Sequence, residues 1–413
     1  MIKKILFFIL SSLNIICLDI YNYDTCILTE NKNFELSQEV KNIAFNNNKS
    51  LGLSKFFDTS KIINSNWVKN ELQKDRTYQE LIAQTSDNKT VEFSYFNRDS
   101  DTLILIGPGF TNSKEKMVPF VHMFIDYDVA ILNFRGHGHS EWRFSPLYNL
   151  MGIDSNIQLG ASEENDIFAV IEALTKNKKY KKIIGLGICF GAFIFVKAEA
   201  IAKEKNLKLF DKLILDGCWL SLDLAKEKIF NDPYLIISPQ YGGAPDYLKS
   251  IFQNKIFRNS LEWCVESVCS IKFAHISLEK YLKEVKIPIL IFQGKNDLMI
   301  SRNEFEEIWN NLETEKIAII TSNPHVHNHL RSKELYKLVC DIFIEENFSS
   351  FINILSDYKK LNENLASKTE NFHKQDIKDF LKPIVVKNKK HFPYWILLLI
   401  VPVIYGIKKF KDR

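Results

Sequence analysis

Spacings typical of metal sites and nucleotide sites are absent from this sequence. The seven cysteines form no CxxC pair and no Cys/His zinc pattern, and only Cys264 and Cys269 lie close together. This spacing does not indicate a disulfide framework, although a Cys264–Cys269 bridge stays open. No GxGxxG follows a first strand and no P-loop occurs. We therefore expect neither a metal ion nor any other cofactor.

Charge of one sign is also scarce. The net charge is +4 over 413 residues, and no dense basic patch contains interleaved aromatic residues. This balance argues against nucleic acid as a partner. Apolar residues make up 46% of the chain and charged residues 25%, which is normal for a globular protein with a substantial core.

Long apolar runs lie near the two ends of the chain. Residues 1–20 combine a short basic start with an apolar run, which predicts a signal peptide or an N-terminal anchor. Residues 391–408 contain FPYWILLLIVPVIYGI and precede a basic tail at 409–413. This pattern predicts a transmembrane helix, and the alternative is a buried C-terminal helix. We expect a membrane-anchored protein whose main domain lies outside the cytoplasm.

Between these ends the sequence divides into three segments of different composition and pattern. Residues 21–76 are polar and read as an N-terminal extension, and residues 347–390 read as a helical stalk. In residues 77–346, apolar runs alternate with helical segments, which predicts a mostly parallel sheet with helices on both faces. The strands are predicted at 103–106, 129–134, 183–188, 213–215, 289–292 and 317–320. Residues 220–285 interrupt the alternation and are predicted to form a helical cap.

One short stretch carries a candidate nucleophile. Residues 185–192 read GLGICFGA, so Cys189 lies between Gly187 and Gly191, after an apolar strand and before a helical segment. In that context G-x-nucleophile-x-G puts the nucleophile on a strained turn, and the glycines let strand and helix approach. The helix N-terminus favours the thiolate. The alternative is a buried thiol in a tight turn.

Several stretches, in the same order along the chain, resemble the α/β-hydrolase family over roughly residues 78–346. They are LILIGPGFTNSKE for the oxyanion loop, VAILNFRGHGHSE for the Arg-Gly-His-Gly turn, ILIFQGKNDLMIS for the acid loop and TSNPHVHNHL for the histidine loop. The order nucleophile, acid, histidine is that of the family. The resemblance implies an α/β-hydrolase fold with a cap.

The departure from the common family pattern is cysteine in place of serine. G-x-C-x-G resembles dienelactone hydrolases and, less closely, polyhydroxyalkanoate synthases. A thiolate attacks carbonyls well, but the resulting thioester must then be transferred to water or to another acceptor.

The resemblance assigns roles to particular residues. Cys189 attacks a carbonyl, a histidine takes its proton, and Asp297 orients that histidine. The backbone N–H groups of Phe110 and Phe190 bind the oxyanion. His325 is favoured as the base, and His327 is the alternative.

Neighbouring polar residues receive structural interpretations. His329 is expected at the surface or against the cap. His137 and His139 are expected to be turn residues, and Asp216 and Cys218 are expected to be structural.

These assignments predict a hydrolase that cleaves a carboxylic ester or a thioester through a Cys-His-Asp triad and an acyl-enzyme. The expected partner is a small-molecule ester or acyl substrate, in addition to the membrane. Two alternatives stay open, namely an acyltransferase that uses the same triad and a non-catalytic hydrolase-like binding protein.

Overall fold

The computed structural model describes most of the region between residues 75 and 355. The described residues are 26–29, 32–35, 75–110, 112–137, 158–236, 243–269, 271–321, 323–331 and 333–355. The predicted terminal segments at 1–20, 391–408 and 409–413, and most of the predicted stalk, lie outside these residues. No described helix is both long enough and apolar enough to cross a bilayer.

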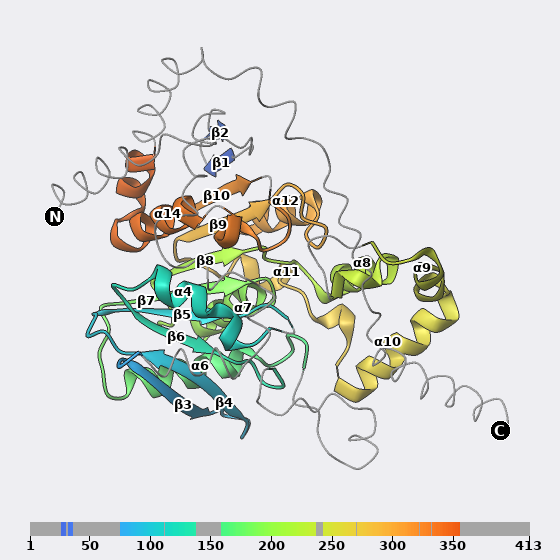
Figure 1. The fold of residues 1–413 in the computed structure, drawn as a ribbon, viewed down its shortest axis with the longest axis horizontal. Coiled ribbons are helices and arrows are strands. Elements are labelled where there is room, and N and C mark those ends of the chain that lie inside the picture. The colour runs from blue at the N-terminus through green and yellow to red at the C-terminus, as the bar shows by residue number, and fades with distance from the viewer. Residues whose placement is uncertain are drawn as a thin grey trace.

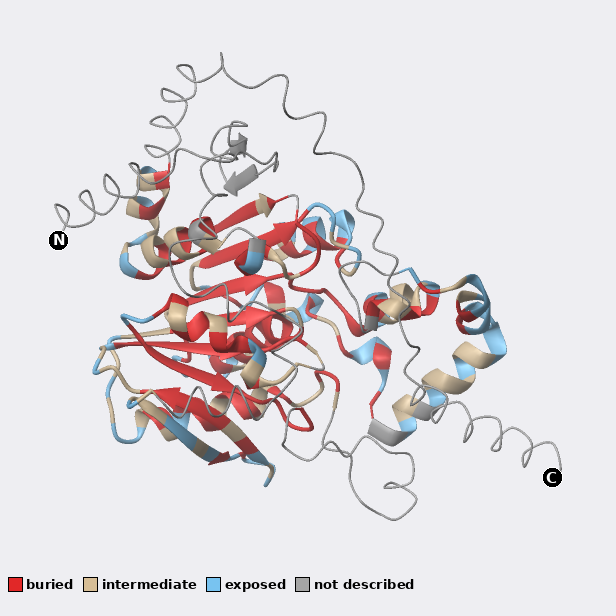
Figure 2. Cartoon of the chain, viewed as in Figure 1, coloured by how far each residue is buried: buried red, intermediate tan, exposed pale blue. Residues whose placement is uncertain are grey.

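A twisted sheet of ten strands forms the centre of the fold, in the order β2-β1-β10-β9-β8-β7-β5-β6-β4-β3 (Figure 1). The parallel strands are β5 (Thr102–Gly107), β6 (Asp128–Leu132), β7 (Lys182–Ile188), β8 (Lys212–Asp216), β9 (Ile289–Gly294) and β10 (Lys316–Thr321). Their residues are almost all buried (Figure 2). The prediction of a mostly parallel sheet is therefore confirmed.

Alternating side chains of the strands enter two separate cores. On β5, Leu103 and Leu105 join one apolar cluster, and Ile104 and Ile106 join the other, because successive side chains of a strand point to opposite faces. The first cluster is covered by α6 (Glu164–Thr175), α7 (Phe190–Glu204), α11 (Glu279–Leu282) and α12 (Arg302–Asn311). The second is covered by α4 (Val118–Met123) and α14 (Lys333–Glu345). Helices thus pack on both faces of the sheet.

Antiparallel strands extend both edges of the sheet. The hairpin of β3 (Tyr78–Gln84) and β4 (Thr90–Phe96) pairs with β6. At the other edge, β1 (Cys26–Thr29) pairs with β10, and β2 (Lys32–Glu35) pairs with β1. The sequence pattern did not predict β1 and β2, which come from the polar extension.

The region 220–285 is helical in its described residues. It contains α8 (Leu222–Asn231), η3 (Pro233–Ile236), α9 (Asp246–Gln253), α10 (Lys255–Cys269), η4 (Phe273–His275) and α11. In Figure 1, α8, α9 and α10 stand to one side of the sheet. Phe230, Leu248 and Phe252 form a small core of their own.

Packing continues beyond residue 346, where the stalk was predicted to begin. Phe351 and Leu355 are buried in the second core, and the Phe351 ring lies 5.2 Å from that of Phe343. The folded body therefore includes at least the first residues of the segment 347–390.

Candidate active site

Cys189 occupies a strained turn between β7 and α7. Its backbone angles are φ 52° and ψ −109°, a conformation that non-glycine residues rarely adopt and that clusters at functional sites. The Cys189 N–H donates to the carbonyl of Asp216 at 2.8 Å, and its own carbonyl accepts from Phe193 N–H at 3.2 Å. The thiol is half-buried and is not in a disulfide.

The glycines on either side permit this turn. A Cβ at Gly187 would lie 2.5 Å from the Cα of Ala192, and a Cβ at Gly191 would lie 2.2 Å from the carbonyl oxygen of Gly107. Real Cβ atoms do not approach so closely, so any side chain would push α7 away from the sheet. The geometry explains why glycine stands at both positions.

Asp297 and His325 meet at the carboxyl ends of β9 and β10. The Nδ1 atom of His325 lies 2.8 Å from Oδ2 of Asp297, and both side chains are almost fully buried. The other carboxylate oxygen of Asp297 accepts from the backbone N–H groups of Met299 and Ile300, each at 2.8 Å. The orientation of the Asp297 carboxylate is therefore fixed by its own loop, independently of its contact with the imidazole.

The electrostatics of His325 favour the imidazolium. Burial disfavours the charged ring, but the Asp297 carboxylate and Cys189 together hold the pKa of His325 well above its ordinary value. The Nε2 atom of His325 is buried and makes no well-directed hydrogen bond within the described residues, although Cys189 lies near enough to influence the ring. Such bonds often align only once substrate is bound.

Of the two candidate histidines, His325 is the one that contacts Asp297. His327 is half-buried, and its backbone N–H donates to the carbonyl of Pro324 at 3.3 Å. Between them, Val326 has a φ of 49°, which is a genuine outlier for a β-branched residue. The strain lies immediately next to the buried imidazole.

The two candidate oxyanion residues lie beside the nucleophile. A Cβ on Gly109 would be 3.3 Å from the Cβ of Cys189, so the loop that leads to Phe110 passes directly next to it. The Phe110 and Phe190 rings are 5.8 Å apart. Phe190 is the first residue of α7, where a backbone N–H has no partner within the helix.

The Arg-Gly-His-Gly turn packs against the same region. Arg135 is buried and donates to Asp166 through Nε at 2.8 Å and Nη2 at 2.6 Å. The His137 ring lies 5.6 Å from the Phe190 ring, and burial lowers the pKa of His137 to about 4. His137 is therefore a neutral packing residue at neutral pH. His139 lies outside the described residues.

The structure places His329 differently from the sequence-based expectation. His329, expected at the surface or against the cap, is buried, and its ring lies 4.6 Å from the Phe120 ring. Its Nδ1 atom is 3.7 Å from Oδ2 of Asp216. Asp216 also accepts from the Asn328 amide at 2.8 Å. The one sign of this buried polar group in the sequence was Asp216, an acidic residue at the end of the mostly apolar strand β8.

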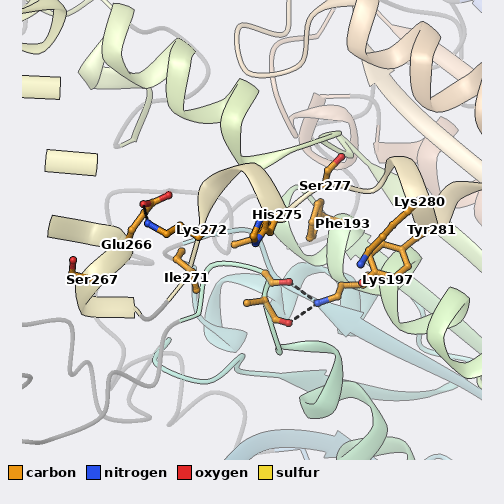
Figure 3. Close-up of a pocket in the computed structure, with 13 residues that line it drawn as sticks. Phe193, Lys197, Glu266, Ser267, Ile271, Lys272, His275, Ser277, Lys280 and Tyr281 are labelled. Atoms are coloured by element: carbon orange, nitrogen blue, oxygen red, sulfur yellow. Dashed lines mark hydrogen bonds and ion pairs between the residues drawn. The ribbon is translucent and has the colours of Figure 1, made fainter. Parts of the chain in front are cut away.

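A cavity of about 580 Å³ lies elsewhere, between α7 and the segment that contains η4 and α11 (Figure 3). Phe193, Lys197 and Tyr281 are among its lining residues, whereas Cys189, Asp297 and His325 are not. The Phe193 ring also stacks on the Trp219 ring, with the ring centroids 4.9 Å apart. Lys197 donates to the carbonyls of Gly160 and Ala161 and to Glu164. The cavity is therefore separate from the His325–Asp297 pair.

Comparison with known proteins identifies the fold. No family model and no curated protein matches the sequence. Among solved structures, an esterase from Pyrococcus furiosus aligns with a TM-score of 0.50 and 20% identity over 65% of this chain and 90% of that protein. The chain has the α/β-hydrolase fold.

Other structures of the same kind align less closely. An esterase from Exiguobacterium antarcticum has a TM-score of 0.46 and 15% identity, over 65% of this chain and 100% of that protein. An acylaminoacyl peptidase from Pyrococcus horikoshii has a TM-score of 0.45 and 16% identity, over 68% of this chain and 45% of that protein. The Pyrococcus furiosus esterase, at 20% identity, shows the fold alone, so the chemistry must be argued from the site.

Within the α/β-hydrolase fold, the described residues contain no cluster of histidine, cysteine and acidic side chains suited to a metal ion. The residues that converge at the carboxyl edge of the sheet are instead a thiol, an imidazole and a carboxylate. This set is suited to nucleophilic acyl chemistry.

Proposed function

We propose that this protein is a hydrolase that cleaves a carboxylic ester or a thioester, with Cys189, His325 and Asp297 as its catalytic triad. The observation that carries the proposal is the 2.8 Å contact between Nδ1 of His325 and Asp297, on an imidazole that Cys189 also influences. The order of the three residues along the chain matches that of the fold's serine enzymes.

Each residue has a defined part in the reaction. The Cys189 thiolate attacks the carbonyl carbon, and the new oxyanion accepts from the backbone N–H groups of Phe110 and Phe190. As the intermediate collapses, the leaving oxygen or sulfur takes a proton from the His325 imidazolium. Water then gives a proton to His325 and attacks the thioester, which releases the acid and restores the thiolate. Asp297 keeps the imidazole oriented and stabilises its positive charge.

The surroundings of Cys189 favour an apolar acyl group. The rings of Phe110, Phe190 and Trp219 lie close to the elbow, with Phe190 and Trp219 5.9 Å apart. Apolar surfaces of this kind gain free energy by covering hydrocarbon. The apolar segments at 1–20 and 391–408 support the further proposal that the hydrolase is membrane-anchored, with its main domain outside the cytoplasm.

The test is turnover of short- and long-chain p-nitrophenyl esters and of acyl thioesters by the full chain. Cys189→Ala abolishes turnover under the proposal, and Cys340→Ala, a buried cysteine in the second core, is the matched control. Mass spectrometry of the Cys189 peptide detects the acyl-enzyme. Equal background rates for wild type and Cys189→Ala on every substrate favour a binding role and contradict the proposal.

A further inference from the structure

Asp216 touches both halves of the proposed site. It is the last residue of β8 and is completely buried between β7, which leads to Cys189, and β9, which leads to Asp297. Its backbone carbonyl accepts from the Cys189 N–H at 2.8 Å. Its Oδ1 atom accepts from the Asn328 amide, also at 2.8 Å. One residue therefore links the nucleophile turn to the histidine loop.

Asn328 in turn ties the end of the histidine loop to its beginning. Its Oδ1 atom accepts from the Thr321 hydroxyl at 2.5 Å and from the Asn323 amide at 3.3 Å. Thr321 is the last residue of β10, so the loop that carries His325 is held at both ends. Through Asn328, both ends of the loop are connected by hydrogen bonds to the Asp216 carboxylate.

The residue after Asp216 contacts the imidazole itself. Gly217 has a φ of +66°, and a Cβ there would lie 3.0 Å from Cε1 of His325 and 3.2 Å from Nδ1. The backbone of Asp216 and Gly217 therefore lies against the elbow on one side and against the His325 ring on the other. A shift of this segment moves one catalytic group relative to the other.

The contact between Asp216 and Asn328 is a polar attachment and not only a packing contact. The Asp216 carboxylate accepts from the amide of Asn328 at 2.8 Å and lies 3.7 Å from the His329 imidazole. The Asp216 and Asn328 side chains are both buried, and a buried polar group that loses its partner is costly. The Asp216–Asn328 hydrogen bond therefore gives the loop a firm attachment.

We propose that Asp216 is a positioning residue that holds the His325 loop, through Asn328, in register with the Cys189 elbow. The proposal deepens the proposed function and rests on it, because it concerns the pairing of Cys189 with His325. It predicts an effect on the chemical step rather than on substrate binding.

The first measurement is steady-state hydrolysis of a soluble p-nitrophenyl ester by full-length variants. Asp216→Ala and Asn328→Ala each lower kcat by about tenfold to a hundredfold with KM nearly unchanged, because small displacements of catalytic groups carry losses of that size. Asp216→Asn keeps an oxygen acceptor for Asn328 and retains kcat within about fivefold. The matched control is Asp211→Ala at the opposite end of β8, where the carboxylate accepts from Ile183 N–H at 2.8 Å.

The second measurement does not depend on turnover. Alkylation of the Cys189 peptide by iodoacetamide, followed by mass spectrometry from pH 5 to 9, reports the pairing of the thiol with His325. In Asp216→Ala the rate at pH 6 relative to that at pH 9 falls at least about threefold, and in Asp211→Ala it does not. If no variant hydrolyses esters but this difference is present, the proposed function is wrong and the positioning role stands.

Three results overturn the positioning role. One is a wild-type alkylation profile in both Asp216→Ala and Asn328→Ala. The second is an equal loss of kcat in Asp211→Ala, which would mean general destabilisation. The third is an Asp216→Asn protein that folds, as judged by its urea unfolding curve, but is no more active than Asp216→Ala. Should Asp216→Ala fail to fold, Asn328→Ala and Asp216→Asn decide the question.

Discussion

The imidazole Nδ1 of His325 lies 2.8 Å from the carboxylate Oδ2 of Asp297, and neither side chain is more than 1% exposed. Water cannot weaken a contact at this depth, and the carboxylate is held in place by two backbone N–H groups of its own loop. The pair therefore fixes one orientation of the imidazole, with Nε2 directed away from Asp297. The following predictions rest on this arrangement.

Replacing the carboxylate by an amide removes the orientation of His325. Asp297→Asn is expected to lower kcat for ester hydrolysis by about a hundredfold to ten-thousandfold with KM little changed, because the ring takes the wrong tautomer. The control is Asp232→Asn, since Asp232 also accepts from backbone N–H groups, those of Tyr234, Gly243 and Ala244. Equal kcat in the Asp297 variant and in wild type would exclude this carboxylate from the chemistry.

One matched pair of variants distinguishes the roles of His325 and His327. His325→Gln is expected to lower kcat at least about a thousandfold, as loss of the general base does in a triad, whereas His327→Gln keeps kcat within about threefold. The comparison uses kcat and the acyl-enzyme yield after a single turnover. The reverse ranking would make His327 the base and would contradict the role given to the Asp297 contact.

The raised pKa of His325 makes a defined contribution to stability. Asp297 and Cys189 hold this pKa well above its ordinary value against the effect of burial, so the folded state binds the proton more tightly than the unfolded chain. The contribution is fully present below about pH 6.5, the ordinary histidine value, and is lost as pH rises through the raised folded pKa. The free energy of unfolding in urea is measured for wild type and His325→Gln between pH 6 and 9.

In that comparison, the difference between wild type and His325→Gln shrinks with rising pH. A difference that grows with pH would mean that the imidazole is held neutral, as His137 is, and would contradict the raised pKa of His325. Because both proteins are measured at every pH, the titration of groups that do not interact with His325 cancels.

The close approach of α7 to β5 is tested at Gly191. A Cβ there would lie 2.2 Å from the Gly107 carbonyl oxygen, so Gly191→Ala is expected to lower the free energy of unfolding by about 3 kcal/mol, at the upper end for overpacking. Gly109→Ala is the milder comparison, because its nearest neighbours would be 3.3 Å away. Urea denaturation measures both. A smaller loss for Gly191→Ala than for Gly109→Ala would show that the helix and strand can separate.

Much of this fold and site follows from local sequence. The buried strands are short apolar runs whose side chains serve two cores, so their pattern is visible without any partner. The turn at Cys189 is equally local, because the glycines at 187 and 191 are needed wherever a strand meets a helix so closely. The candidates Asp297 and His325 came from the resemblance of their loops to the acid and histidine loops of the α/β-hydrolase family, and each follows a recognisable strand.

Other features depend on contacts between distant segments, which a local pattern does not contain. The strands β1 and β2 come from a polar stretch and exist through pairing with β10. His325 and His327 are two residues apart in one loop, and the path of that loop through Val326 decided which of them meets Asp297. Asp216 and Asn328 are 112 residues apart. Sequence determined which residues can react, and tertiary packing alone determined which of them meet, because their juxtaposition depends on how distant strands align in the sheet.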